Sequence, residues 1–257
     1  MCRWLTYFGR PIHLERLLFE PENSLIKQSL KARHATVTTN GDGFGVGWYG
    51  DRETPGVYRE ILPAWNDPNL KSLSHQLSSR LFFAHVRAST GTETSRANCH
   101  PFTFGRWLFM HNGQIGGYPA VRRKLESMIP DGLYMHRRGT TDSEVFFLLL
   151  FANGVDDDPE GAIVRTIGQV RRAMRDGFVT EPFRMTAILS DGARVIAVRY
   201  SCDPNPPSLF WDDKAEDMLI VSEPLDFDAG HWTEVPPAHL LVTDGKGAPT
   251  VKAFQPA

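Results

Sequence analysis

The sequence predicts an α+β fold in which helices pack on antiparallel β-sheet. Three observations support this prediction: apolar strand-like runs fill the first half, helical patterns follow them, and strand patterns return near the end. Strands grouped before and after helices, rather than alternating with them, are typical of layered α+β folds.

The first half is dominated by short apolar runs that end in glycine or polar residues, as strands do. A short amphipathic helix is expected at 22–33, and a glycine-rich turn leads into a strand at 40–50. Further strands are expected at 1–9 (MCRWLTYFG), 80–89 (RLFFAHVRAS) and 106–113 (RWLFMHNG).

Two helices are expected in the middle of the chain. In the segment 141–154, Thr141 can cap the helix, Glu144 follows at the spacing of a capping box, and Gly154 follows its end. The segment 160–177 repeats apolar residues at helical spacing, namely Ile163, Ile167, Val170 and Met174, before a glycine.

Strand patterns dominate the last third. The segment 183–200 contains two β-branched runs around SDGA, which predicts a hairpin. Short strands are expected at 217–222 and within 239–254, and DPNPP at 203–207 is expected to be a loop that could mark a subdomain boundary.

Composition excludes several classes of protein. The net charge of −2 argues against a nucleic-acid or anionic-membrane partner. The longest apolar run, Val145–Ala152, is far shorter than the roughly 20 residues that span a bilayer. No secretory signal is recognisable. Three cysteines without metal-ligand spacing predict a reduced, cytoplasmic protein without a bound metal. We also expect no cofactor. We expect Cys99 and Cys202 to be packing residues.

Cys2 is the first candidate catalytic residue. Removal of Met1 would leave Cys2 with both a thiol and the free α-amine, whose reference pKa values are about 8.5 and 7.7–8.0. One residue then carries a nucleophile and its own base. The alternative is a small buried apolar residue that happens to be second in the chain.

Polar residues follow three other predicted elements. Arg87 ends an apolar strand and offers a guanidinium that suits a carboxylate, or it simply covers apolar neighbours with its stem. Asn112 and Gly113 can supply two donors to an oxyanion, or form an ordinary Asn-Gly turn. Asp142, next to Thr141, can hold an ammonium group or only compensate the helix dipole.

Together these groups are those needed to hold and cleave glutamine at its side-chain amide. The Met-Cys start, NGDGFGVGWY, FAHVRASTG, NCHPF, FMHNGQI and TTDSE, in this order, resemble the class II glutamine amidotransferases of the N-terminal-nucleophile hydrolase superfamily. The chain is similar to the stand-alone branch that contains γ-glutamyl hydrolases and the amidase subunit of glutathione degradation, and VSEPLDFDAGHWTEVPPAHLLV supports that similarity.

The resemblance implies a four-layer αββα sandwich and a single glutamine amidotransferase domain over residues 2–257. It implies that Cys2 forms a γ-glutamyl thioester while Asn112 and Gly113 hold the oxyanion. By the same resemblance, Arg87 binds the α-carboxylate and Asp142 the α-ammonium group. Supporting contacts are implied for Thr90, Thr141 and His100, although a packed histidine explains His100 equally well.

The sequence departs from the family pattern at one position. Many synthetase-linked members have a tryptophan after the arginine, where this chain has Ala88, so packing over the substrate is expected to differ. We expect no second catalytic domain, which leaves a γ-glutamyl hydrolase acting alone or an amidase subunit with a separate synthase or peptidase partner.

Two alternatives from other classes remain at this point. One is a non-catalytic relic of the fold that binds an amino acid through Arg87 and Asp142. The other is a thiol–imidazole cysteine protease that uses Cys2 with His100 or His111, but this leaves Arg87 and Asp142 without a role.

Overall fold

The computed structural model describes residues 2–33, 39–89, 91–213, 217–228 and 230–256. The helices are α1 (Glu15–Leu18), α2 (Leu25–Leu30), α3 (Pro68–Gln76), α4 (Tyr118–Glu126), α5 (Asp131–Tyr134), α6 (Asp142–Ala152) and α7 (Pro159–Asp176). The strands of the first half are β1 (Arg3–His13), β2 (Phe44–Trp48), β3 (Gly56–Glu60), β4 (Ser78–Val86), β5 (Phe102–Phe104) and β6 (Trp107–Gln114). Those of the second half are β7 (Arg184–Ser190), β8 (Val195–Ser201), β9 (Phe210–Asp212), β10 (Met218–Val221), β11 (Thr233–Glu234), β12 (His239–Thr243) and β13 (Thr250–Ala253).

These strands form two antiparallel sheets. The first has the order β11-β9-β10-β1-β4-β2-β3 and the second the order β13-β12-β8-β7-β6-β5. The connection that contains 203–207 leaves β8 in the second sheet and enters β9 in the first. The predicted loop at DPNPP is therefore a crossover between sheets.

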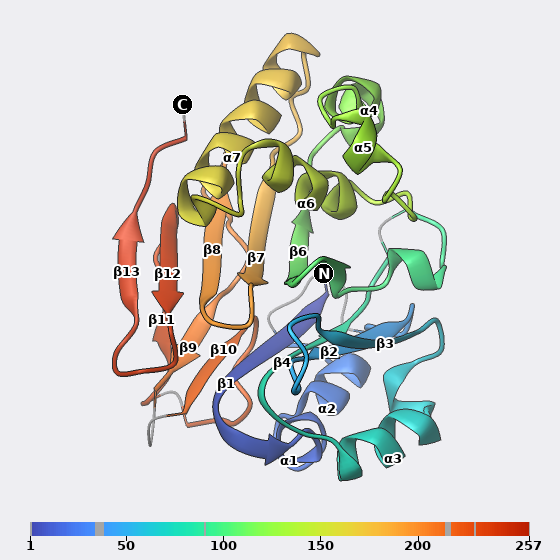
Figure 1. Ribbon diagram of the computed structural model, residues 1–257, viewed down its shortest axis with the longest axis vertical. Coiled ribbons are helices and arrows are strands. Elements are labelled where there is room, and N and C mark those ends of the chain that lie inside the picture. The colour runs from blue at the N-terminus through green and yellow to red at the C-terminus, as the bar shows by residue number, and fades with distance from the viewer. Residues whose placement is uncertain (1, 34–38, 90, 214–216, 229, 257) are drawn as a thin grey trace.

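Helices cover the outer face of each sheet, with α1–α3 on the first and α4–α7 on the second (Figure 1). Three apolar cores separate these four layers. The core between the two sheets includes Trp4, Phe83 and Met110. A second core joins the first sheet to α1–α3, and a third joins the second sheet to α4, α6 and α7. The predicted αββα sandwich is confirmed.

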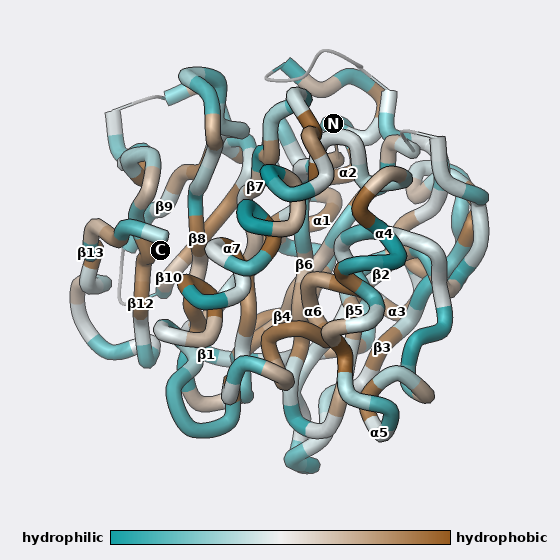
Figure 2. Tube along the Cα trace, turned by 90° about the horizontal axis from the view of Figure 1, so that it is seen from above, coloured by the Kyte–Doolittle hydropathy of each residue, from teal (hydrophilic) through white to brown (hydrophobic). Residues whose placement is uncertain are grey.

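Helix α6 is apolar on all sides because it is enclosed in the third core, where its residues from Ser143 to Leu150 are buried. Apolar colour gathers along α6 and the inner strands, and hydrophilic colour lies mainly on the outer loops (Figure 2). In α7, by contrast, the four predicted apolar positions are buried and most of the charged ones are not. No helix among the described residues is long and apolar enough to cross a membrane.

Several short elements have too little sequence pattern to be predicted. Strand β9 has three residues and β11 has two; β9 pairs with β10, the next strand along the chain, whereas β11 pairs with β9 about twenty residues earlier. The predicted helix at 22–33 is shorter than expected, since α2 covers only Leu25–Leu30. Cys99 is buried as expected, but the expectation for Cys202 was wrong, because its side chain is exposed in the turn after β8.

Candidate active site

The predicted site residues come together where the ends of four elements meet. Arg3 of β1 pairs with Val86 of β4, which brings Cys2 beside the residues that follow β4. Strand β5 pairs with β6 only as far as Phe109, so the last part of β6 has no strand partner on that edge among the described residues. This open edge and the start of α6 complete the site.

A cavity of about 220 Å³ lies at this junction. Seven of the predicted residues line it, namely Cys2, Arg87, His100, Asn112, Gly113, Thr141 and Asp142. Thr90 and Met1 lie outside the described residues. The cavity wall also contains Ala88, Ser89, Thr92, Asn98, His111, Gln114, Ser143 and Arg184.

The Cys2 thiol lies against the backbone of Ala88. Its sulfur accepts a hydrogen bond from the Ala88 N–H at 3.4 Å and donates to the Ala88 carbonyl at 3.5 Å. Burial raises the pKa of the Cys2 thiol above its ordinary value, and the Ala88 N–H acts in the opposite direction because it stabilises the thiolate. A second group that removes the thiol proton would therefore help this sulfur to react.

Asn112 is a buried amide without a partner. Its side chain is 1% exposed, and neither Nδ2 nor Oδ1 has a hydrogen-bond partner among the described residues. An unpaired buried amide is costly, so the Asn112 side chain is available to bond a group that enters the cavity.

Gly113 follows Asn112 with a φ of +152°. A Cβ atom at this position would lie 2.0 Å from the Arg184 carbonyl oxygen of the neighbouring strand β7, which leaves room only for glycine. The backbone is therefore held close against β7 at the point where it borders the cavity.

Arg87 is 4% exposed and held by the turn that follows it and by the segment before β2. Its Nη1 donates to the Asp42 carbonyl at 3.1 Å, and its Nη2 donates to the Thr92 hydroxyl at 2.7 Å and the Ser89 hydroxyl at 3.2 Å. These bonds place a fixed positive charge on one wall of the cavity.

Asp142 places a negative charge on the wall formed by the start of α6. Its carboxylate accepts hydrogen bonds from the Ile115 N–H at 2.7 Å and the Ser143 N–H at 2.8 Å. Thr141 caps α6 as predicted, since its hydroxyl accepts from the Glu144 N–H at 3.2 Å. The predicted second half of the capping box is wrong, because the Glu144 carboxylate instead accepts from the Arg138 and Gly139 N–H groups.

Three histidines lie in or behind the wall, and burial lowers the pKa of each below its ordinary value: to about 3 for His85, well below it for His100, and also for His111. His100 packs between His85 and Phe102 with tilted rings, at ring-centroid distances of 4.5 and 4.4 Å, and neither of its ring nitrogens has a hydrogen-bond partner among the described residues. His111 Nδ1 lies 2.7 Å from the Ser143 hydroxyl.

Sequence reasoning missed several wall residues. Ser143 lies inside the motif TTDSE and could have been found there, whereas His111 was considered only as the base of a cysteine protease. Asn98 begins the motif NCHPF and could have been found there, whereas Arg184 has no local signal, since only the fold brings it to the cavity. Among the described residues, no group of three or more histidine, cysteine, aspartate or glutamate side chains could hold a metal ion.

The chain is similar in sequence to several known proteins. The family model described as "Glutamine amidotransferases class-II" matches residues 20–203. The "Probable glutamine amidotransferase DUG3" of Saccharomyces cerevisiae is 36% identical, over 94% of this chain and 81% of its own. The "Gamma-glutamyl-hercynylcysteine sulfoxide hydrolase" of Mycobacterium tuberculosis is 30% identical, over 96% of this chain and 94% of its own.

Solved structures show the same fold. A glutamine aminotransferase class-II domain protein from Silicibacter pomeroyi superposes with a TM-score of 0.78 at 36% identity, covering 99% of this chain and 100% of its own. The glutamine phosphoribosylpyrophosphate amidotransferase of Bacillus subtilis superposes with a TM-score of 0.68 at 15% identity, covering 98% of this chain and 49% of its own.

Proposed function

The chain belongs to the class II glutamine amidotransferase family, and on that premise we propose that it is an amidohydrolase that cleaves a γ-glutamyl amide bond. The observation that carries the proposal is the single cavity where Cys2, Arg87, Asn112, Gly113 and Asp142 meet. The relatives named as γ-glutamyl-hercynylcysteine sulfoxide hydrolases support a γ-glutamyl substrate.

Two charges of opposite sign suit the α-carbon end of the glutamyl group. Arg87 binds the α-carboxylate, and Asp142 binds the α-ammonium group by a charge-assisted hydrogen bond. Thr141, and by family resemblance Thr90, assist as polar neighbours. The γ-carbonyl then lies toward Cys2, with Asn112 Nδ2 and the Gly113 N–H as donors to its oxygen.

The reaction needs Met1 to be removed, so that Cys2 carries the chain's α-amine. The amine takes the thiol proton, and the sulfur attacks the γ-carbonyl carbon, whose oxygen becomes the oxyanion. The C–N bond then breaks and the leaving amine takes the proton, which leaves a γ-glutamyl thioester. Water adds to the thioester with its proton passing to the α-amine, the C–S bond breaks, and glutamate and free Cys2 are formed.

A thiol–imidazole protease is less consistent with the site. The hydrogen bonds of the Cys2 sulfur run to Ala88, and His111 is engaged by Ser143. Burial lowers the pKa of both His100 and His111, which disfavours an imidazolium partner for a thiolate. We therefore assign His100 a packing and orienting role beside the substrate.

The proposal is tested by mass spectrometry of the intact protein together with glutamate release from glutamine and γ-glutamyl peptides. We expect Met1 to be absent, glutamate to be released, and Cys2→Ala to abolish release. Release that persists in Cys2→Ala, or no release from protein that begins at Cys2, contradicts the proposal. Full activity of the isolated chain would exclude the alternative of a partner-dependent subunit.

A further inference from the structure

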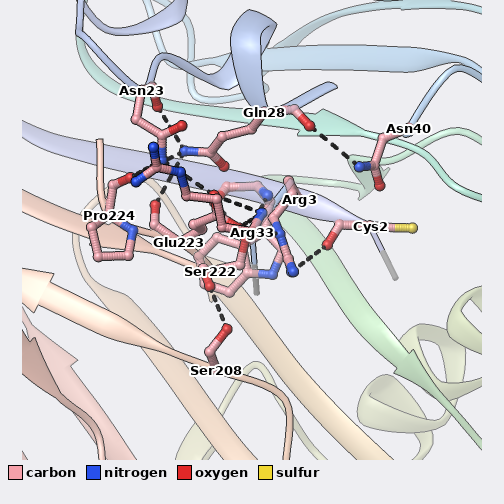
Figure 3. Close-up of polar contacts among 11 residues, drawn as sticks. Cys2, Arg3, Asn23, Gln28, Arg33, Asn40, Ser208, Ser222, Glu223 and Pro224 are labelled. Carbon is pink, nitrogen blue, oxygen red and sulfur yellow. Dashed lines mark hydrogen bonds and ion pairs between the residues drawn. The ribbon is translucent and has the colours of Figure 1, made fainter. Parts of the chain in front are cut away.

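A buried ion pair lies directly behind the proposed nucleophile. The Arg3 and Glu223 side chains are 0% and 1% exposed, and Arg3 Nε lies 3.0 Å from Glu223 Oε2. Arg3 Nη1 also donates to the carbonyl oxygen of Cys2 at 3.0 Å. Figure 3 shows the Cys2 carbonyl turned toward this pair and the thiol turned away from it.

Glu223 connects the ion pair to a second segment of the chain. Its carboxylate accepts hydrogen bonds from Asn23 Nδ2 at 3.2 Å and from the Arg33 N–H at 3.0 Å. Gln28 of α2 donates to the Glu223 carbonyl at 3.3 Å (Figure 3). The carboxylate is thus held on one side by residues 23–33 and on the other by the start of β1.

The register of the sheet holds Glu223 in place. The Trp4 N–H donates to the Ser222 hydroxyl at 2.9 Å, and the Ser222 N–H donates to the Trp4 carbonyl at 3.0 Å. These bonds continue the ladder between β1 and β10 up to the residue before Glu223. The backbone that carries Glu223 is therefore tied to the central strands of the first sheet.

A buried ion pair is a costly way to fill a core, because two well-packed apolar side chains often hold a fold equally well or better. What the pair adds here is a directed hydrogen bond from Arg3 to the Cys2 carbonyl, which fixes the orientation of the Cys2 backbone. The thiol and the α-amine are both attached to that backbone. We propose that Glu223 is a positioning residue for the nucleophile: through Arg3 it holds the backbone of Cys2 in the orientation that the reaction requires.

The expected loss of activity rests on the proposed function, whereas the expected loosening of the Cys2 backbone rests on geometry alone. The test therefore uses two readouts: steady-state kinetics of glutamate release, and hydrogen–deuterium exchange of the peptide that covers residues 2–8. The variants are Glu223→Gln, which removes the charge at constant size, and the apolar double variant Arg3→Met/Glu223→Leu.

We expect Glu223→Gln to lower kcat by about tenfold or more while KM changes by less than about twofold, because a misplaced nucleophile slows the reaction without altering Arg87 or Asp142. We expect its N-terminal amides to exchange at least about tenfold faster. The double variant should fold, as judged by circular dichroism and thermal unfolding, yet show the same loss of kcat. If its kcat equals that of the unmodified protein, the pair is only structural and the inference is wrong.

Glu234→Gln is the control for loss of a glutamate–arginine pair elsewhere in the fold, because Glu234, although 53% exposed itself, pairs with the largely buried Arg199 at 2.7 Å and lines no part of the cavity. Its kcat and N-terminal exchange should not change. If the unmodified protein releases no glutamate, the proposed function fails, and the exchange measurement alone decides whether Glu223 holds Cys2. Unchanged exchange in Glu223→Gln then overturns the inference.

Discussion

Replacing Asn112 by leucine is expected to stabilise the protein while it destroys activity. The Asn112 amide is 1% exposed and has no hydrogen-bond partner among the described residues. Burying an unpaired amide costs about 1–3 kcal/mol, and leucine has nearly the same shape without that cost. Asn112→Leu should therefore raise the free energy of unfolding by about 1–3 kcal/mol.

The activity should change in the opposite direction. Loss of one oxyanion donor typically costs about 2.7–4 kcal/mol in the transition state, which corresponds to a decrease of about 100- to 1,000-fold in kcat. The assay pairs urea unfolding, followed by circular dichroism, with glutamate release from a γ-glutamyl substrate on the same preparation.

Asn98 provides a control of the same residue type and burial. Its Nδ2 donates to the Glu93 carbonyl at 2.8 Å, and its Oδ1 accepts from the Thr140 N–H at 2.8 Å. Asn98→Leu should therefore lower the free energy of unfolding by about 1–3 kcal/mol, because these buried groups lose their partners. If Asn112→Leu is destabilised like Asn98→Leu, or keeps full kcat, the reasoning about Asn112 is refuted.

Three further outcomes are expected. Gly113→Ala should lose about 2 kcal/mol or more of unfolding free energy and most of its kcat, because the new Cβ meets a β7 carbonyl. Gly105→Ala is the control: Gly105 has a φ of +56° but open space around it, so this variant should lose only about 1 kcal/mol and no activity. Equal losses of the two variants in urea unfolding would contradict this reasoning. The free energy of unfolding should fall as the pH drops below about 6.5, by up to about 1.4 kcal/mol per pH unit for each buried neutral histidine. The reason is that the unfolded chain binds a proton that folded His85, with a pKa of about 3, does not bind. His85→Asn should make the slope of stability against pH less steep, and an unchanged slope would contradict the assignment. Asp142→Asn should raise KM about 10- to 100-fold through loss of a charge-assisted hydrogen bond of about 1.5–3 kcal/mol, and an unchanged KM would exclude Asp142 from ammonium binding.

The long elements could be predicted from sequence because their patterns are local. Helix α6 begins at the Thr141 cap and ends before Gly154, and α7 shows its buried face in the spacing of its apolar residues. Strand β9 has no such signal, since three residues carry no measurable period. It becomes a strand through its pairing with β10 on one side and β11 on the other.

The site was predictable for a different reason. Each of Cys2, Arg87, Asn112 and Asp142 has an ordinary structural explanation, and only their combined chemistry indicated one pocket. The pairing of Arg3 with Glu223 could not be predicted in this way, because 220 positions separate the two residues. Arginine and glutamate are common residues, so neither one indicates from the sequence which distant residue it pairs with.

Strand β1 lies between β4 and β10 in the first sheet, so the beginning of the chain pairs with residues made more than 200 positions later. During synthesis, this strand must remain without one of its two neighbours until β10 has left the ribosome. Contacts so distant along the chain slow folding and prolong the exposure of an apolar edge. Because Cys2, the proposed nucleophile, directly precedes this central strand, its final placement during folding depends on the synthesis of β10.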